Sequence, residues 1–338
     1  MTAVAPEQLR TASLTDVGRT RSENQDSYGE FRGPSGARLM AVADGMGGHK
    51  GGATASRITI EALGEVFERT PDAGEATLRE AFETANARVH QTAQGRPDLR
   101  GMGTTCVALI FAADGAAWVA HVGDSRAYLL RDSRMAPLTA DHSTVAELVR
   151  LGQITPEAAA VHPRRNEILR SIGAEPSVQV DVAPVDVRPG DQYLLCSDGL
   201  SGLVADPEMG AVLQRNSPEN ATRILVDLAN ERGGPDNVTV MVTAVPGADT
   251  AGSYAPVPSW ETEEARASAR RRVRWIAAAA AAIAALLAIS LLLLLFTTEE
   301  ISLGGTRLAE PAFAVDDSAP RSEAVPPQRE GPRGEPVR

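Results

Sequence analysis

The feature that most constrains this chain is an apolar segment near its C-terminus, residues 275–296, which reads WIAAAAAAIAALLAISLLLLLF. A helix of this length reaches roughly 33 Å, enough to cross a hydrocarbon core of about 30 Å. Helices buried in a globular core are rarely apolar on every face over such a length. The segment therefore predicts a transmembrane helix, and its distance from the N-terminus excludes a secretory signal peptide.

Charges on either side of this segment predict its orientation. Four arginines lie within 270–274, whereas Glu299 and Glu300 follow the segment. Cytoplasmic flanks of membrane helices are enriched in Lys and Arg. We therefore expect a single-pass protein of the cell membrane, with residues 1–274 in the cytoplasm and residues 297–338 outside.

The remaining sequence divides into one domain and two solvated segments. Residues 5–245 have the length and apolar content of a single catalytic or binding domain. Residues 246–274 are rich in Pro, Gly, Ser and charge, which predicts a flexible juxtamembrane linker. The proline-rich residues 297–338 predict a disordered extracytoplasmic tail, because they cannot bury enough apolar surface to fold.

Composition excludes some classes of function. The chain has 33 basic and 44 acidic side chains, a formal net charge of −11, and no basic tract besides 270–274. A nucleic-acid-binding protein would need clustered Lys and Arg to neutralise phosphates, so we expect no nucleic-acid partner. Cys106 and Cys196 each lie in an apolar run, which favours buried free thiols over a disulfide or a thiolate metal site.

Apolar patterning within residues 5–245 predicts strands and amphipathic helices. The predicted strands are 38–43, 104–110, 116–122, 126–130, 193–196 and 238–245, and the predicted helices are 52–69, 75–94 and 218–231. The connections 113–115 and 123–125 are so short that only antiparallel neighbours could use them. We therefore expect an α+β fold, a layered α-β-β-α sandwich of two antiparallel sheets flanked by helices.

Aspartates stand at the ends of several predicted strands, namely Asp44, Asp124, Asp198 and Asp236, and Asp26 lies in a polar stretch near the N-terminus. Carboxylates that converge on one rim of a sheet repel each other unless a cation neutralises them. Such an all-oxygen set suits Mg²⁺ or Mn²⁺, and no histidine has zinc-like spacing. The alternative from spacing alone is that these are independent turn aspartates.

A resemblance decides between these alternatives. Six motifs carry it, in chain order: 16–26 (DVGRTRSENQD), 43–48 (ADGMGG), 103–105 (GTT), 123–126 (GDSR), 197–199 (SDG) and 236–237 (DN). Together they resemble the ordered motifs of the metal-dependent protein phosphatases (PPM, type 2C) in their bacterial serine/threonine form. The resemblance covers roughly residues 10–245.

The resemblance implies hydrolysis of phosphoserine and phosphothreonine on proteins. A hydroxide held between two Mn²⁺ or Mg²⁺ ions would attack phosphorus in line. Asp44 would bridge the two ions, and the Gly45 carbonyl, Asp198 and Asp236 would complete their coordination. Arg21 would bind the phosphate oxygens through its bidentate guanidinium.

The resemblance also implies supporting roles. Asp124 would hold a third ion, as in bacterial members, and Asn237 would support Asp236 from outside the metal shell. Asp26 would act as a water-mediated or second-shell ligand. Gln25 stands where the family often has Glu, which removes a negative charge and predicts weaker metal affinity beside Asp26.

With its membrane segment, the chain is similar to the single-pass phosphatases of actinobacteria that oppose Hanks-type kinases. This implies phosphorylated proteins as partners, including such kinases and their substrates. The alternative is a pseudophosphatase that binds phosphoproteins as a scaffold. The leaving-group acid stays open between His49 and water, and residues 141–173 are either a mobile flap over the site or a surface insertion.

Overall fold

The computed structural model describes residues 5–247, apart from the side chains of Gly48 and His49. The membrane segment predicted at 275–296, the tail and nearly all of the linker lie outside the described residues. Among the helices of residues 5–247, none is both long enough and apolar enough to cross a bilayer.

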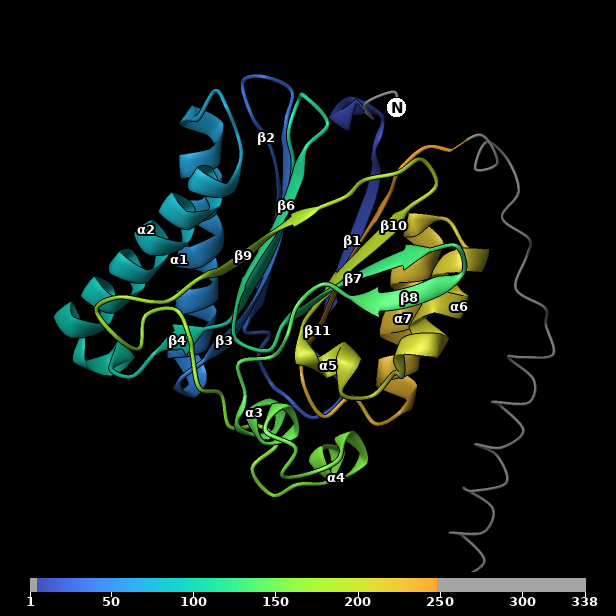
Figure 1. Cartoon of the computed structure of the whole chain (residues 1–338). Helices are drawn as coiled ribbons and strands as arrows, with labels where there is room; N and C mark the ends of the chain where they lie inside the picture. The colour runs from blue at the N-terminus through green and yellow to red at the C-terminus, as the bar shows by residue number, and fades with distance from the viewer. Residues whose placement is uncertain (1–4, 248–338) are drawn as a thin grey trace, which may run out of the picture. The chain divides into compact units, whose positions relative to one another are not determined.

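Two antiparallel sheets face each other at the centre of the fold (Figure 1). The first has the strand order β1-β11-β10-β7-β8, with bounds β1 Arg10–Asp16, β7 Arg126–Arg131, β8 Arg134–Pro137, β10 Gln192–Cys196 and β11 Val238–Ala244. The second has the order β2-β3-β5-β6-β9, with β4 paired to β3, and its bounds are β2 Asp26–Arg32, β3 Arg38–Met46, β4 Gly103–Thr104, β5 Cys106–Phe111, β6 Ala117–Val122 and β9 Asp181–Val185.

Helices cover the outer faces of both sheets. In Figure 1, α1 and α2 lie on the second sheet, and α6 and α7 lie on the first. The helix bounds are α1 Gly48–Arg69, α2 Glu75–Gly95, α3 Thr144–Arg150, α4 Pro156–Ala160, α5 Asp198–Ser201, α6 Asp206–Arg215 and α7 Pro218–Glu231. The predicted four-layer α-β-β-α arrangement is confirmed for the described residues.

The central strands are apolar on both faces because both faces are buried. In β3, Leu39 and Ala41 join the cluster under α1 and α2, whereas Met40 and Val42 join the cluster between the sheets. The period of two assigns successive side chains to these opposite layers. This explains why the sequence shows continuous apolar runs here rather than an alternating pattern.

One predicted connection is wrong. The 113–115 link joins antiparallel β5 and β6 as expected, but β6 and β7, joined by 123–125, belong to different sheets. Gly123 has φ +99°, and a Cβ there would lie 2.6 Å from Thr105 Cγ2. A glycine therefore lets the chain turn against Thr105 and cross between the sheets instead of closing a hairpin.

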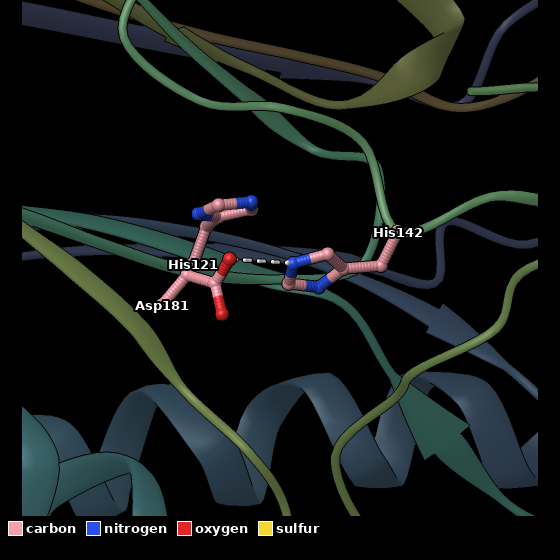
Figure 2. A group of neighbouring side chains, drawn as sticks. All are labelled: His121, His142 and Asp181. Atoms are coloured by element: carbon pink, nitrogen blue, oxygen red, sulfur yellow. Dashed lines mark hydrogen bonds and ion pairs between the residues drawn. The ribbon is translucent and has the colours of Figure 1, made fainter. Parts of the chain in front are cut away.

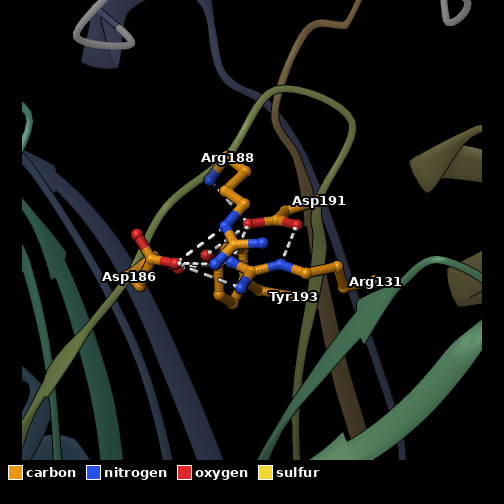
Figure 3. A network of polar contacts seen from close by, with 5 residues as sticks. All are labelled: Arg131, Asp186, Arg188, Asp191 and Tyr193. Carbon is orange, nitrogen blue, oxygen red and sulfur yellow. Dashed lines mark hydrogen bonds and ion pairs between the residues drawn. The ribbon is translucent and has the colours of Figure 1, made fainter. Parts of the chain in front are cut away.

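An ion-pair network joins β7 and β10 of the first sheet at one end and reaches Asp186, which follows β9 of the second sheet (Figure 3). Asp191, which is 1% exposed, accepts hydrogen bonds from Arg131 Nε at 2.8 Å, the Arg188 N–H at 2.7 Å and the Tyr193 hydroxyl at 3.1 Å. Arg131 is the last residue of β7, and Asp191 directly precedes β10. The buried carboxylate is thus fully supplied with donors and one arginine.

Candidate metal centre and active site

The predicted site aspartates meet at the opposite end of the sandwich from this network. Asp26 and Asp44 are register partners at the paired ends of β2 and β3. Asp124 follows β6, Asp198 follows β10 by one residue, and Asp236 precedes β11. These strand ends face a cavity of about 470 Å³, whose lining includes Arg21, Gln25, Asp44, Gly45, Asp124, Asn166, Ile168, Asp198, Asp236 and Asn237.

Asp44 is held through its backbone. Its N–H donates to Thr105 Oγ1 at 3.1 Å, and its carbonyl accepts from the Thr105 N–H at 2.9 Å and from Thr104 Oγ1 at 2.7 Å. At Gly45, a Cβ would lie 2.1 Å from the Gly52 carbonyl oxygen. A side chain is therefore excluded at this position, and the backbone beside Asp44 is fixed against α1.

Asp26 lies behind the cavity with one carboxylate oxygen fully engaged. Its Oδ2 accepts from Ser197 Oγ and from Thr239 Oγ1, both at 2.7 Å. Its Oδ1 is buried and has no hydrogen-bond partner among the described residues. Two hydroxyls thus orient this carboxylate and leave its second oxygen available, which fits the supporting role expected of it.

The other carboxylates are placed by short local features. Asp198 begins α5, and its Oδ1 is also buried without a partner in the described part of the chain. Asp236 Oδ2 accepts from Arg21 Nη2 at 2.8 Å, and Asp236 Oδ1 accepts from the Asn237 N–H at 2.9 Å. Asp124, 9% exposed, sits in the turn that crosses between the sheets.

Burial and mutual repulsion raise the pKa values of Asp26, Asp44, Asp124 and Asp198. Desolvation comes first and repulsion from neighbouring aspartates adds to it, raising the pKa of Asp26 to about 6 and of Asp124 to about 7. The pKa of Asp44 is raised well above its ordinary value for the same reasons, and that of Asp198 is raised as well. The cluster is therefore short of positive charge.

Few cations among the described side chains offset this charge. The Arg21 side chain, which pairs with Asp236, is 53% exposed. Arg126 is nearer the interior, but its guanidinium is committed to Asp141 through bonds of 2.8 and 2.7 Å. Buried carboxylate oxygens without donors are the environment that hard divalent cations prefer. The residues present therefore fit Mn²⁺ or Mg²⁺ held by Asp44, Asp198 and Asp236, with the Gly45 carbonyl beside them.

Asn237 and Gln25 act mainly on the loop that carries Arg21. Asn237 Nδ2 donates to the carbonyls of Val17 and Glu23, and its Oδ1 accepts from the Gln25 N–H at 2.8 Å. The Gln25 carbonyl in turn accepts from the Gly45 N–H. Asn237 therefore supports Asp236 through its backbone N–H, while its side chain fixes the preceding loop.

One rim of the cavity comes from residues 141–173. Asn166 and Ile168 line it, and bridges from Ser143 to Ile168 and from Thr104 to Ile172 close the base of this segment. Its α3 and α4 lie beyond the site end of the sheets (Figure 1). The segment contributes to the site, and His49, the candidate acid, lies outside the described side chains.

Sequence reasoning missed the hydroxyls that orient the Asp26 carboxylate, Ser197 and Thr239. One signal was available for Thr239. In β11, Val238, Val240 and Val242 pack under α7, so the alternate residues face the other sheet. A buried threonine at the site end of that face indicates a polar contact in the interior.

The raised pKa values predict how pH acts on the metal-free protein. Between about pH 4 and pH 7 the folded state binds more protons than the unfolded chain, so the free energy of unfolding should fall as pH rises through this window. Urea denaturation in EDTA at several pH values measures this. Asp124→Asn should flatten the dependence and stabilise the metal-free protein at pH 8, whereas saturating Mn²⁺ should remove the loss. Stability that rises with pH in EDTA would contradict this electrostatic account.

Comparison with known proteins places this site in a family. The sequence profile described as Protein phosphatase 2C matches residues 18–229. The serine/threonine phosphatase stp of Listeria welshimeri is 40% identical over 234 residues, which cover 68% of this chain and 92% of that protein. The serine/threonine protein phosphatase PstP of Mycobacterium tuberculosis is 42% identical over 238 residues, 70% of this chain but 45% of PstP.

A solved structure agrees with the fold. The catalytic domain of PstP in complex with two manganese ions has a TM-score of 0.62 and 40% identity, and the match covers 70% of this chain and 98% of that one. The shared features include two antiparallel sheets flanked by helices. By sequence, fold and the aspartates that meet at one end of its sheets, this chain belongs to the protein phosphatase 2C family and is a serine/threonine protein phosphatase.

Proposed function

We propose that this chain is a membrane-anchored, Mn²⁺- or Mg²⁺-dependent phosphatase of phosphoserine and phosphothreonine in cytoplasmic proteins. One observation carries the proposal. Asp44, Asp124, Asp198 and Asp236 line one cavity with Asp26 behind it, and Arg21 is the one basic side chain among the described lining residues. A cluster of carboxylates without nearby positive charge destabilises the folded state. Such a cluster is expected where bound cations neutralise it and take part in the reaction.

The residues divide the work as follows. Two divalent ions bound by Asp44, Asp198, Asp236 and the Gly45 carbonyl would lower the pKa of a water molecule towards neutrality and offset phosphate charge. Asp124 would hold a third ion. No residue of the cavity needs to act as a covalent nucleophile in this scheme, because water attacks phosphorus in line.

Arg21 would bind the substrate phosphate. Its guanidinium lies at the cavity and pairs with Asp236 in this structure. Once Asp236 has a cation as its counter-charge, the half-exposed Arg21 side chain can turn to the non-bridging phosphate oxygens. Its planar fork matches two of these oxygens, which lysine could not do.

Phosphate release from a phosphothreonyl peptide tests the proposal directly. We expect release in Mn²⁺ and none in EDTA, and Asp44→Ala should slow it by about a thousandfold or more because the cation site is lost. The matched control is Asp114→Ala, since Asp114 lies in the β5–β6 turn away from the cavity. Gln25→Glu should lower the Mn²⁺ concentration that gives half-maximal rate.

The opposite result would favour another function. Folded protein that binds the phosphopeptide but releases no phosphate in Mn²⁺ or Mg²⁺ would identify a pseudophosphatase scaffold. Release that is unchanged in Asp44→Ala would refute the assigned cation site.

We further propose that residues 275–296 anchor the enzyme in the cell membrane, with the catalytic domain in the cytoplasm and residues 297–338 outside. The support is the length of the apolar segment and the arginines at 270–274. This placement would bring the site close to membrane-bound Hanks-type kinases and their substrates, which we propose as its phosphoprotein partners.

Fractionation of cells tests the anchor. The full chain should stay with membranes after an alkaline carbonate wash, whereas a chain ending at residue 247 should be released. In inside-out vesicles, protease should remove the catalytic domain but spare a tag at the C-terminus. A carbonate-released full chain, or protection of the catalytic domain, would contradict the proposed topology.

A further inference from the structure

A second group of functional side chains lies outside the carboxylate cluster. His121 of β6, His142, and Asp181 at the start of β9 come together, as Figure 2 shows. The two imidazole rings are stacked, with centroids 4.5 Å apart and planes 22° from parallel. Both histidines are buried. None of the three has a role in the reaction described above.

Hydrogen bonds fix the proton on His142. The Gly123 N–H donates to His142 Nδ1 at 3.1 Å, so Nδ1 must carry the lone pair. In the neutral ring the proton is then on Nε2, which lies 3.2 Å from Asp181 Oδ2 and donates to it. Arg170 Nη1 also lies 3.2 Å from Nε2, but a guanidinium can only donate, so with this tautomer its hydrogen bond goes to Asp181 Oδ1 instead. Burial lowers the pKa of His142, which keeps the ring neutral.

This tautomer argues against a metal ion in the group, although its residue types could ligate one. A ligating Nε2 would have to lose its proton while Nδ1 still accepts the Gly123 N–H, which a neutral imidazole cannot do. A positive charge is also already present, because Arg170 Nη1 donates to Asp181 Oδ1 at 2.8 Å. The group is therefore a hydrogen-bonded link between the turn at Gly123 and Asp181 of β9.

His142 lies where three segments of the chain meet, namely the turn at Gly123, the 141–173 segment and β9. The backbone N–H of His142 donates to the Gly123 carbonyl at 3.0 Å, and the imidazole accepts from the Gly123 N–H. His142 therefore bonds both backbone polar groups of the residue before Asp124. Its carbonyl accepts from the Leu169 N–H at 2.7 Å, which joins the two ends of the 141–173 segment. Its Nε2 reaches Asp181 of β9.

We propose that His142 is a positioning residue that acts through Asp124. It holds the turn where the chain crosses between the sheets, through Nδ1, and thereby sets the place of the Asp124 carboxylate. Gly123 must be glycine here, because its φ is +99° and a Cβ would lie 2.6 Å from Thr105 Cγ2. The inference rests on the proposed function, because it assigns Asp124 to a cation site.

Two substitutions separate the contacts of His142. In His142→Asn, Oδ1 can take the place of Nδ1 and accept the Gly123 N–H, but the link to Asp181 is lost. In His142→Gln, the longer amide can still reach Asp181, but no acceptor remains near Gly123. His121→Gln is the control, because His121 Nε2 bonds the Ala140 carbonyl and, within residues 5–247, the His121 side chain forms no hydrogen bond with Gly123.

The test measures Mn²⁺ binding by calorimetry, and kcat and KM for a phosphopeptide, on the full chain in detergent. We expect His142→Gln to weaken Mn²⁺ binding and lower kcat about tenfold with little change in KM, as is typical when a ligand loses its support. His142→Asn and His121→Gln should stay within about threefold of the parent chain. In an Asp124→Ala background, His142→Gln should cost nothing further.

Other outcomes overturn the inference. Equal losses in His142→Asn and His142→Gln, or a full additional loss in the Asp124→Ala background, would show that His142 serves general stability. One fewer tightly bound ion in both His142 variants and in His121→Gln would identify a metal site at the histidines instead. Mn²⁺ binding is read without turnover, so failure of the phosphatase proposal would appear separately, as intact binding without phosphate release.

Discussion

Repulsion among buried carboxylates is the interaction on which the rest of this structure depends. Five aspartates meet at one end of the sandwich, and the pKa values of Asp26, Asp44, Asp124 and Asp198 are raised because burial and neighbouring charge both disfavour ionisation. The contrast with Asp191 at the other end is instructive. The Asp191 carboxylate is also buried, but it accepts hydrogen bonds from Arg131, Tyr193 and a backbone N–H, and the arginine balances its charge. The negative charge at one end of the fold is balanced by an arginine, whereas the aspartates at the other end have too few basic side chains nearby to balance them.

The sandwich itself creates this asymmetry. Because the strands of both sheets are antiparallel and in register, residues far apart in sequence reach the same end, as Asp26 and Asp44 do. Hydroxyl groups from the facing sheet then orient a carboxylate at this end, because Thr239 and Ser197 both donate to Asp26. The turn at Gly123 adds Asp124 from the crossing point. The residues that form the core of the sandwich are thus different from the aspartates that form the site.

Much of this could be predicted from the sequence, and the exceptions have physical causes. Strands buried on both faces, such as β3 and β5, were predictable from continuous apolar runs. Strands β1 and β2 were not, because they lie at sheet edges and carry many polar residues. The 123–125 link was misassigned because its length permits a hairpin, whereas the placement of β6 and β7 in different sheets depends on tertiary packing that the link does not encode.

The site aspartates were identified by motif. The hydrogen bonds that orient Asp26 depend on tertiary packing, and the sequence indicates them only weakly, through the buried Thr239.

The central claim is that the carboxylate cluster is a cation site. Anomalous diffraction at the manganese edge, from crystals of the catalytic domain grown in Mn²⁺, tests it most directly. The account predicts two strong peaks among Asp44, Asp198 and Asp236, with the Gly45 carbonyl within coordination distance. An empty cluster in ordered crystals that contain Mn²⁺ elsewhere, for example beside His121 and His142, would contradict it.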